Sequence, residues 1–145
     1  MTPFTTRAAR LLPAAAFLAL ACTAQAELKL PTIIGDHMVL QQKQANPIWG
    51  WDTPGTAVTV AFAGQQKTAT AGADGKWTVK LDPLPANATP ATLSVKGTTA
   101  ATVEDVLVGE VWICSGQSNM QWEVGQSWDG NLEALSSKFP NLRLV

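Results

Sequence analysis

One serine of this sequence has neighbours suited to nucleophilic chemistry. Ser118 lies in the polar stretch Ser-Gly-Gln-Ser-Asn at 115–119, after an apolar run at 111–114 and before residues 120–123, which suit a first helical turn. A buried strand, a tight turn and a helix start together expose a serine hydroxyl at the carboxyl edge of a sheet. We therefore predict Ser118 as a candidate nucleophile. A polar turn without a catalytic role is the alternative.

The same turn offers donors for an oxyanion, which a serine nucleophile also requires. Gly116 permits a tight backbone path, and the N–H groups of Ser118 and Asn119 would lie at a helix start, where unpaired donors favour an anion. The side chains of Gln117 and Asn119 could donate further hydrogen bonds or hold the turn. We predict Gly116, Gln117 and Asn119 as support for the oxyanion and the turn.

A general base for Ser118 is not evident in the chain. The single histidine, His37, follows Gly35 and Asp36 in a turn-like sequence far from Ser118. A triad is defined by geometry and not by chain order, so spacing alone leaves His37 open as a base. We expect a surface or packing histidine at a strand start. The sequence shows no cluster of metal ligands, and we expect neither a metal nor an organic cofactor.

Alternating apolar residues predict strands before the serine segment. Val58, Val60 and Phe62 alternate with smaller or polar residues, and Pro54-Gly55 and Asp74-Gly75 are turn signals. The expected strands are 36–42, 47–51, 56–62, 67–71, 77–81, 91–96 and 98–103. Three prolines predict an irregular connection at 82–90. Short strands with frequent turns predict a mainly β fold, an antiparallel β-sandwich.

The pattern changes near residue 105, where we place a domain boundary. Residues 106–108 could complete the sandwich, and the apolar run 111–114 indicates a strand buried on both faces, in which Cys114 acts as a small buried hydrophobe. Apolar spacing predicts a helix at 131–139, capped by Asp129 or Asn131. Residues 142–145 look like the beginning of another strand. We therefore expect a sandwich at 27–105 and a truncated α/β domain at 106–145.

The first 26 residues have the features of a secretory signal peptide. Arg7 and Arg10 precede an apolar stretch, and Ala24-Gln25-Ala26 fits a cleavage site. We expect a secreted or periplasmic protein that is not membrane-bound after cleavage. The chain carries 10 basic and 11 acidic residues without a basic run, which argues against nucleic-acid binding.

Several stretches together resemble one known family. Residues 109–120, with the sequence Gly-Glu-Val-Trp-Ile-Cys-Ser-Gly-Gln-Ser-Asn-Met, look like the nucleophile segment of the sialate O-acetylesterases, a branch of the SGNH hydrolases. Residues 36–41, 48–51 and 75–77 match in the same order. The resemblance implies an esterase that removes O-acetyl groups from sialic acids or related acetylated sugars, with Ser118 as nucleophile.

The resemblance also implies residues that this chain does not contain. Such enzymes are expected to complete the oxyanion hole from later strands and to carry the base in an Asp-x-x-His segment, and no Asp here precedes a His by three positions. We therefore expect an N-terminal fragment that is inactive on its own. The alternatives are a non-catalytic carbohydrate-binding β-sandwich, with Trp49, Trp51 or Trp77 stacking on sugars instead of filling the core, and a scaffold without a site.

Overall fold

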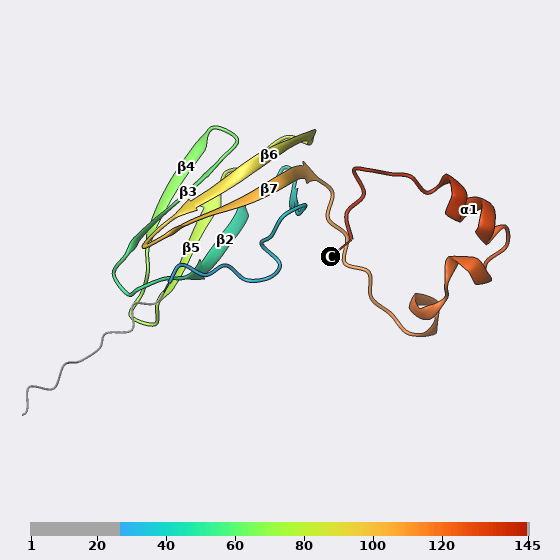
Figure 1. Ribbon diagram of the computed structural model, residues 1–145, viewed down its shortest axis with the longest axis horizontal. Helices are drawn as coiled ribbons and strands as arrows, with labels where there is room; N and C mark the ends of the chain where they lie inside the picture. Colours follow the sequence, from blue (N-terminus) through green and yellow to red (C-terminus); the bar gives the residue numbers. More distant parts are fainter. Residues whose placement is uncertain (1–26, 145) are drawn as a thin grey trace, which may run out of the picture.

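The computed structural model describes residues 27–144, so the expected signal peptide at 1–26 lies outside the described residues. The described chain is mainly β, as predicted, with helical turns only near its C-terminal end (Figure 1). Its elements are β1 (Val39–Gln41), β2 (Asn46–Trp51), β3 (Ala57–Phe62), β4 (Gln65–Thr70), β5 (Lys76–Leu81), β6 (Asn87–Lys96), β7 (Ala100–Gly109), the 3₁₀ helices η1 (Ser118–Gln121) and η2 (Val124–Gln126), and α1 (Gly130–Ser136). None of the described helices has the length and apolar character needed to cross a membrane.

The strands form two sheets. One has the order β1-β7-β6-β3-β4, and the other consists of β2 and β5. The ladders are antiparallel except between β1 and β7, which run parallel with Val39 opposite Leu107. A purely antiparallel arrangement was therefore a wrong prediction. Parallel strands require a long crossover connection, and the chain from β2 to β6, which lies between β1 and β7 in sequence, supplies it.

Both sheets contribute to one hydrophobic core. In β3 the buried residues are Val58, Val60 and Phe62, which confirms the predicted period of two. The second sheet adds Ile48 from β2 and Trp77 from β5, and these side chains belong to the same buried cluster. Burial of such side chains is the main stabilising contribution to the fold.

Two tight turns that contain glycine connect their strands in different ways. Ala63 and Gly64 both have positive φ, 48° and 78°, and close the hairpin between β3 and β4. Gly75 also has a positive φ of 77°, but its turn joins β4 to β5, which belong to different sheets. Asp74-Gly75, a pair typical of hairpins, thus forms a tight turn here, but the hairpin that it suggests does not form.

Strand β6 is longer than expected, because it begins at Asn87 and passes through Pro90. The prediction of an irregular connection was wrong for residues 87–90. The pairing of β6 with β7 is irregular here, with register shifts on both sides of Ala91. Proline is tolerated in a strand where the ladder is interrupted in this way.

Strand β7 passes through the expected boundary near residue 105 without ending. Leu93 of β6 pairs with Val103, whereas Ala91 pairs with Val106, so β7 contains one extra residue in this interval. Asp105 has a φ of 55° there, as in a β-bulge. The bulge breaks the alternation of apolar residues, which explains why the pattern suggested a boundary. The β-rich part instead extends to Gly109.

After Gly109 the chain leaves the sheets, forms an open loop and returns to the β-rich part (Figure 1). Residues 111–114 form no strand, and Cys114 is exposed, so both predictions for this run were wrong. A strand requires a hydrogen-bonded neighbour, and this run has none among the described residues. Helix α1 ends at Ser136, and its N-cap Asp129 makes no side-chain capping bond. The expected strand is absent from residues 142–144.

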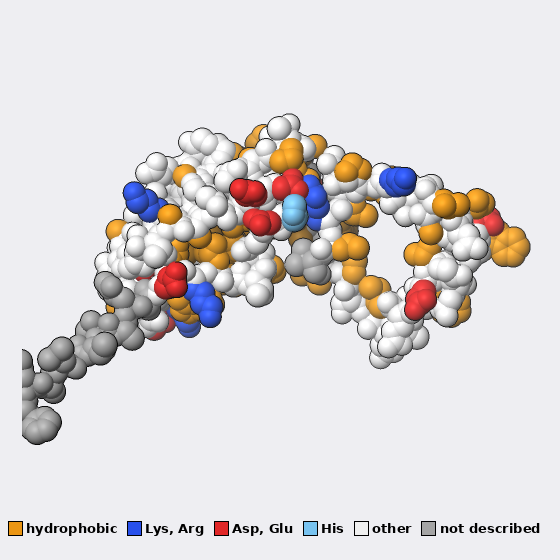
Figure 2. Space-filling model, in the orientation of Figure 1, with side chains coloured by type: hydrophobic (Ala, Val, Ile, Leu, Met, Phe, Trp, Pro, Cys, Tyr) orange, Lys and Arg blue, Asp and Glu red, His pale blue; other side chains and the backbone are white. Residues whose placement is uncertain are grey.

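The segment 110–144 leaves most of its apolar side chains exposed, and Figure 2 shows them around the loop. Twelve of the fourteen large exposed hydrophobic side chains of the described residues belong to it, and Ile113 is 94% exposed. The buried hydrophobic residues of the described chain end at Val108. This segment therefore has no core of its own.

Candidate active site

Ser118 begins the short helix η1, at the end of the extended run and its turn. The Met120 N–H donates to the Gln117 carbonyl at 2.9 Å, which closes the first turn. The helical turn that was expected at 120–123 thus starts two residues earlier and is 3₁₀ in form. Ser118 is exposed, and within residues 27–144 its hydroxyl makes no hydrogen bond. The hydroxyl is accessible but has no base beside it in the described chain.

The backbone around Ser118 presents free donors. Among the described residues, the N–H groups of Ser118 and Asn119 have no acceptor, as is usual at the start of a helical turn. The side chains of Gln117 and Asn119 are exposed and make no hydrogen bond within 27–144, so they do not hold the turn. A Cβ atom at Gly116 would lie 2.8 Å from Cγ of Met120. Gly116 therefore gives the Met120 side chain room.

His37 binds an aspartate and has no hydrogen bond to Ser118. Its Nδ1 lies 2.5 Å from Oδ2 of Asp105, and its side chain is 68% exposed. The sequence predicted a surface or packing histidine at a strand start, and the structure shows a surface histidine. A positive φ of 66° places His37 in the turn before β1. Figure 2 shows the histidine beside acidic and basic side chains, close to where the loop meets the β-rich part.

Asp105 also binds Arg143 from the returning end of the loop. Nη2 of Arg143 lies 3.0 Å from Oδ1 and 2.9 Å from Oδ2. The hydrogen bond with His37 is the main cause that holds the pKa of Asp105 below its ordinary value, and the Arg143 charge adds to it against the effect of burial. Asp105 is therefore ionised at neutral pH and joins two parts of the chain.

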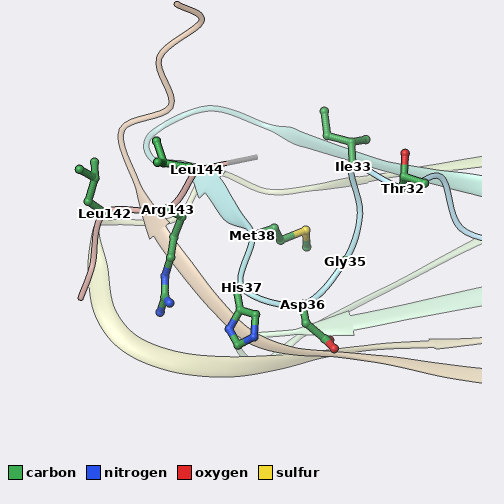
Figure 3. A pocket seen from close by; sticks show the side chains of 9 residues that line it. All are labelled: Thr32, Ile33, Gly35, Asp36, His37, Met38, Leu142, Arg143 and Leu144. Atoms are coloured by element: carbon green, nitrogen blue, oxygen red, sulfur yellow. The ribbon is translucent and has the colours of Figure 1, made fainter. Parts of the chain in front are cut away.

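A small pocket of about 230 Å³ lies beside this ion pair (Figure 3). Its walls come from the turn before β1 and from the returning end of the loop, with Ile33 and Met38 on one side and Leu142 and Leu144 on the other. Arg143 extends alongside His37 in Figure 3. The pocket is smaller than most ligand sites, which span about 300–1,000 Å³.

The other predicted binding residues differ in exposure. Trp77 is 2% exposed and belongs to the core, and Trp49 is partly buried against it, as expected for packing residues. Trp51 is 36% exposed and is not a core residue. Within residues 27–144, no three His, Cys, Asp or Glu side chains are placed to hold a metal ion together.

Sequence comparison relates the chain to esterases of sugars. The mouse sialate O-acetylesterase is 36% identical over 116 residues, which are 72% of this chain and 21% of the mouse protein. The human sialate O-acetylesterase is also 36% identical, over 72% of this chain and 22% of its own length. The chain is a homologue of the sialate O-acetylesterases. The resemblance expected from the sequence is thereby confirmed, although no protein-family model matches.

A solved structure agrees with this relationship. The crystal structure of a carbohydrate acetylesterase from Xanthomonas citri superposes on this sialate O-acetylesterase homologue with a TM-score of 0.73 and 38% identity, covering 78% of this chain and 26% of that one. The chain spans about a fifth of the length of its mouse and human relatives.

Sequence reasoning missed the residues that connect the loop to the sheets. Asp105 was interpreted as part of a domain boundary, and Gln41 as part of an expected strand and of a family motif. The available signal for Asp105 was a carboxylate at the point where the alternation of apolar residues breaks. Such a break can mark a β-bulge, and bulges often redirect a side chain. Their partners, Arg143 and Glu110, lie too far along the chain to be inferred from local pattern.

Proposed function

We propose that this chain supplies the nucleophile of an esterase that removes O-acetyl groups from sialic acids or related acetylated sugars. The observation that carries the proposal is the 36% identity to sialate O-acetylesterases over 72% of the chain. The accessible hydroxyl of Ser118 and the free N–H groups of Ser118 and Asn119 support it. Because the chain covers about a fifth of these relatives, the activity and the substrate of the whole protein are part of what we propose.

In this mechanism the Ser118 hydroxyl attacks the acetyl carbonyl, and a base takes its proton. The described residues place no base beside Ser118, so we assign the base to sequence outside them, as the family resemblance implies. The N–H groups of Ser118 and Asn119 would contribute to oxyanion stabilisation. The base gives this proton to the sugar oxygen, so that the sugar leaves as an alcohol, and water then hydrolyses the acetyl-serine, which releases acetate and regenerates the serine.

The proposal includes an architecture and a location. We propose that residues 27–109 form a β-sandwich and that the following segment begins an α/β domain of the SGNH type. The two sheets that share one core, and the free apolar surface of the segment, support this division. We further propose that residues 1–26 direct export to the periplasm or the medium, a proposal supported by their sequence. N-terminal sequencing of the exported protein would check the cleavage after Ala26.

The test is an assay with 4-nitrophenyl acetate and O-acetylated sialic acid. The 145-residue chain is expected near background, and a polypeptide extended to the length of the relatives is expected to be active. In the extended polypeptide, Ser118→Ala should lower kcat by at least about 10³-fold, as loss of a nucleophile does. Ser115→Ala, a matched serine in the same turn, should change kcat less than about threefold. Full activity in Ser118→Ala would disprove the assignment.

A further inference from the structure

We propose that residues 36–42, together with Asp105, form a clamp that holds both ends of the segment 110–144 and so positions Ser118. Gln41 and Asp105 are its positioning residues. The inference rests on the proposed function of Ser118. It gives residues 36–42 a positioning role, in which they do not contact the reacting atoms. The two ends of the segment are held by different contacts.

Gln41 and Gln42 hold the exit of the segment. The Gln41 amide Nε2 donates to Oε2 of Glu110 at 2.9 Å, and its Oε1 accepts the Val111 N–H at 2.8 Å. Nε2 of Gln42 donates to Oε1 of Glu110 at 2.5 Å, and the Gln42 N–H donates to the Gly109 carbonyl at 2.8 Å. Glu110 thus accepts from two amides, and these hydrogen bonds hold its pKa below the ordinary value.

The backbone of Gln41 is itself fixed by a buried side chain. Asn46 is 7% exposed, and its Oδ1 accepts the Gln41 N–H at 3.0 Å while its Nδ2 donates to the Gln41 carbonyl at 2.9 Å. The parallel pairing of β1 with β7 adds further backbone bonds at this place. Gln41 therefore presents its amide to the segment from a rigid support.

The second anchor is the ion pair at the return of the segment. The bulge in β7 places Asp105 where it binds Arg143 through both oxygens, while His37 holds Oδ2 from the other side. Arg143 is only 21% exposed, and its neighbours Leu142 and Leu144 line the pocket beside the turn that precedes β1 (Figure 3). A partly buried, doubly contacted ion pair holds its groups better than an exposed pair does.

Between these anchors the segment has little else to hold it. Among its described residues only Gly130 is buried. Tying both ends of such a loop removes much of the conformational freedom of the residues between them. Orientation of a nucleophile is sensitive to displacements of about 1 Å, which can cost on the order of 100-fold in rate. The clamp thus affects chemistry through position, without touching the reacting atoms.

The experiment measures the position of the segment in the 145-residue chain. Cys114 is exposed and is the single cysteine of residues 27–144, so Cys22→Ser leaves it as one labelling site. Thr70→Cys on β4 adds the second site, and pulsed electron–electron resonance gives the distance distribution between two spin labels. We expect the width of this distribution to increase at least twofold in Gln41→Ala and in Asp105→Asn.

Matched variants separate the clamp from general destabilisation. Gln65→Ala removes an amide that binds the backbone of Asp82, and Lys67→Ala removes an ion pair with Asp82, both remote from the segment. These variants should leave the width unchanged. Arg143→Ala lies outside the β-rich core and should broaden the distribution, whereas Arg143→Lys should retain a narrow one because a single nitrogen makes both contacts. An unchanged width in Arg143→Ala or Gln41→Ala overturns the proposal.

A kinetic measurement links the clamp to Ser118. In the extended polypeptide, Gln41→Ala is expected to lower kcat roughly tenfold with KM within about twofold, as misplacement of a nucleophile does. Gln65→Ala should leave both constants unchanged. A normal kcat in Gln41→Ala overturns the positioning role even where the labels show a broader distribution. The spin-label result does not depend on catalysis, so failure of the esterase proposal remains distinguishable from failure of the clamp.

Discussion

The hydroxyl of Thr98 donates to Oδ1 of Asp52 at 2.6 Å and joins the end of β2 to the turn between β6 and β7. The N–H groups of Thr98 and Thr53 donate to the same carboxylate at 3.0 Å and 2.7 Å. Asp52 is 1% exposed. Burial alone would raise the pKa of Asp52, but the hydrogen bonds from Thr98 and Thr53 outweigh it, and the pKa lies below its ordinary value. Asp52 therefore connects the two sheets as a carboxylate.

Replacement of Asp52 should destabilise the fold. Asp52→Ala removes the acceptor for three donors, two of them on Thr98, and we expect a loss of about 2–4 kcal/mol in the free energy of unfolding. Urea denaturation followed by circular dichroism measures it. Asp82→Ala is the control, because its exposed ion pair with Lys67 should contribute about 0–1 kcal/mol. Equal losses in the two variants would contradict the role of Asp52.

The close packing of Gly97 against Asp52 leads to a second prediction. A Cβ atom at Gly97 would lie 1.9 Å from Oδ2 of Asp52 and 3.3 Å from Val58 Cγ2, so Gly97→Ala must displace the carboxylate. We expect a lower melting temperature by roughly 5–15 °C, since overpacking typically costs 1–3 kcal/mol. Gly125→Ala meets no atom within 4 Å and should melt within about 2 °C of the parent. Differential scanning calorimetry of the parent chain, Gly97→Ala and Gly125→Ala measures the three melting temperatures.

Acidification should release the returning end of the segment. The pKa of Asp105 is lower in the folded chain than in the unfolded one, so its ionised form stabilises the folded arrangement. That contribution is complete above the unfolded pKa and is lost as the pH falls through the folded pKa. His37 and Arg143 are the partners of this carboxylate, and Asp36 precedes His37 in the chain. The distribution of distances between spin labels at positions 114 and 70 should therefore broaden over this acidic range.

A carboxyl ¹³C titration tests the cause directly. His37→Ala removes the largest cause of the low pKa of Asp105 and should raise that pKa toward its ordinary value. Lys67→Ala, which removes a different ion pair, should leave the titration of Asp105 unchanged. A titration of Asp105 that is insensitive to His37→Ala would refute the assignment of the hydrogen bond.

Core and loop residues should respond differently to truncation. Leu93 is fully buried, and Leu93→Ala should cost about 2–5 kcal/mol in the free energy of unfolding. Ile113 is 94% exposed, and Ile113→Ala should change stability by less than about 0.5 kcal/mol. The Ile113 variant should instead bind less of a hydrophobic dye and associate less at high concentration, because exposed apolar patches drive association. Denaturation and light scattering measure the two effects.

Local pattern predicted the strands in which apolar and polar residues alternate without interruption. The alternation in β3 and β5 identified both strands and their buried faces within about one residue. The run 111–114 has equally strong strand propensity and forms no strand, because a strand also requires a neighbour. Residue types indicated a turn and a helical start close to Ser118, although the helical turn begins at Ser118 itself and not at residue 120. The bonds of Gln41 and Asp105 did not, because their partners are brought near only by the completed sheets.

The parallel pairing of β1 with β7 has a consequence for the order of folding. The partners lie at opposite ends of the β-rich sequence, with Val39 opposite Leu107 and Gln41 opposite Gly109. Closing such a distant contact is slow compared with forming the β3–β4 hairpin, because loop entropy is lost before the pairing is gained. The β1 edge should therefore be among the last parts of the sheet to form, and refolding intermediates should already protect the amides of β3 and β4 while those of β1 still exchange.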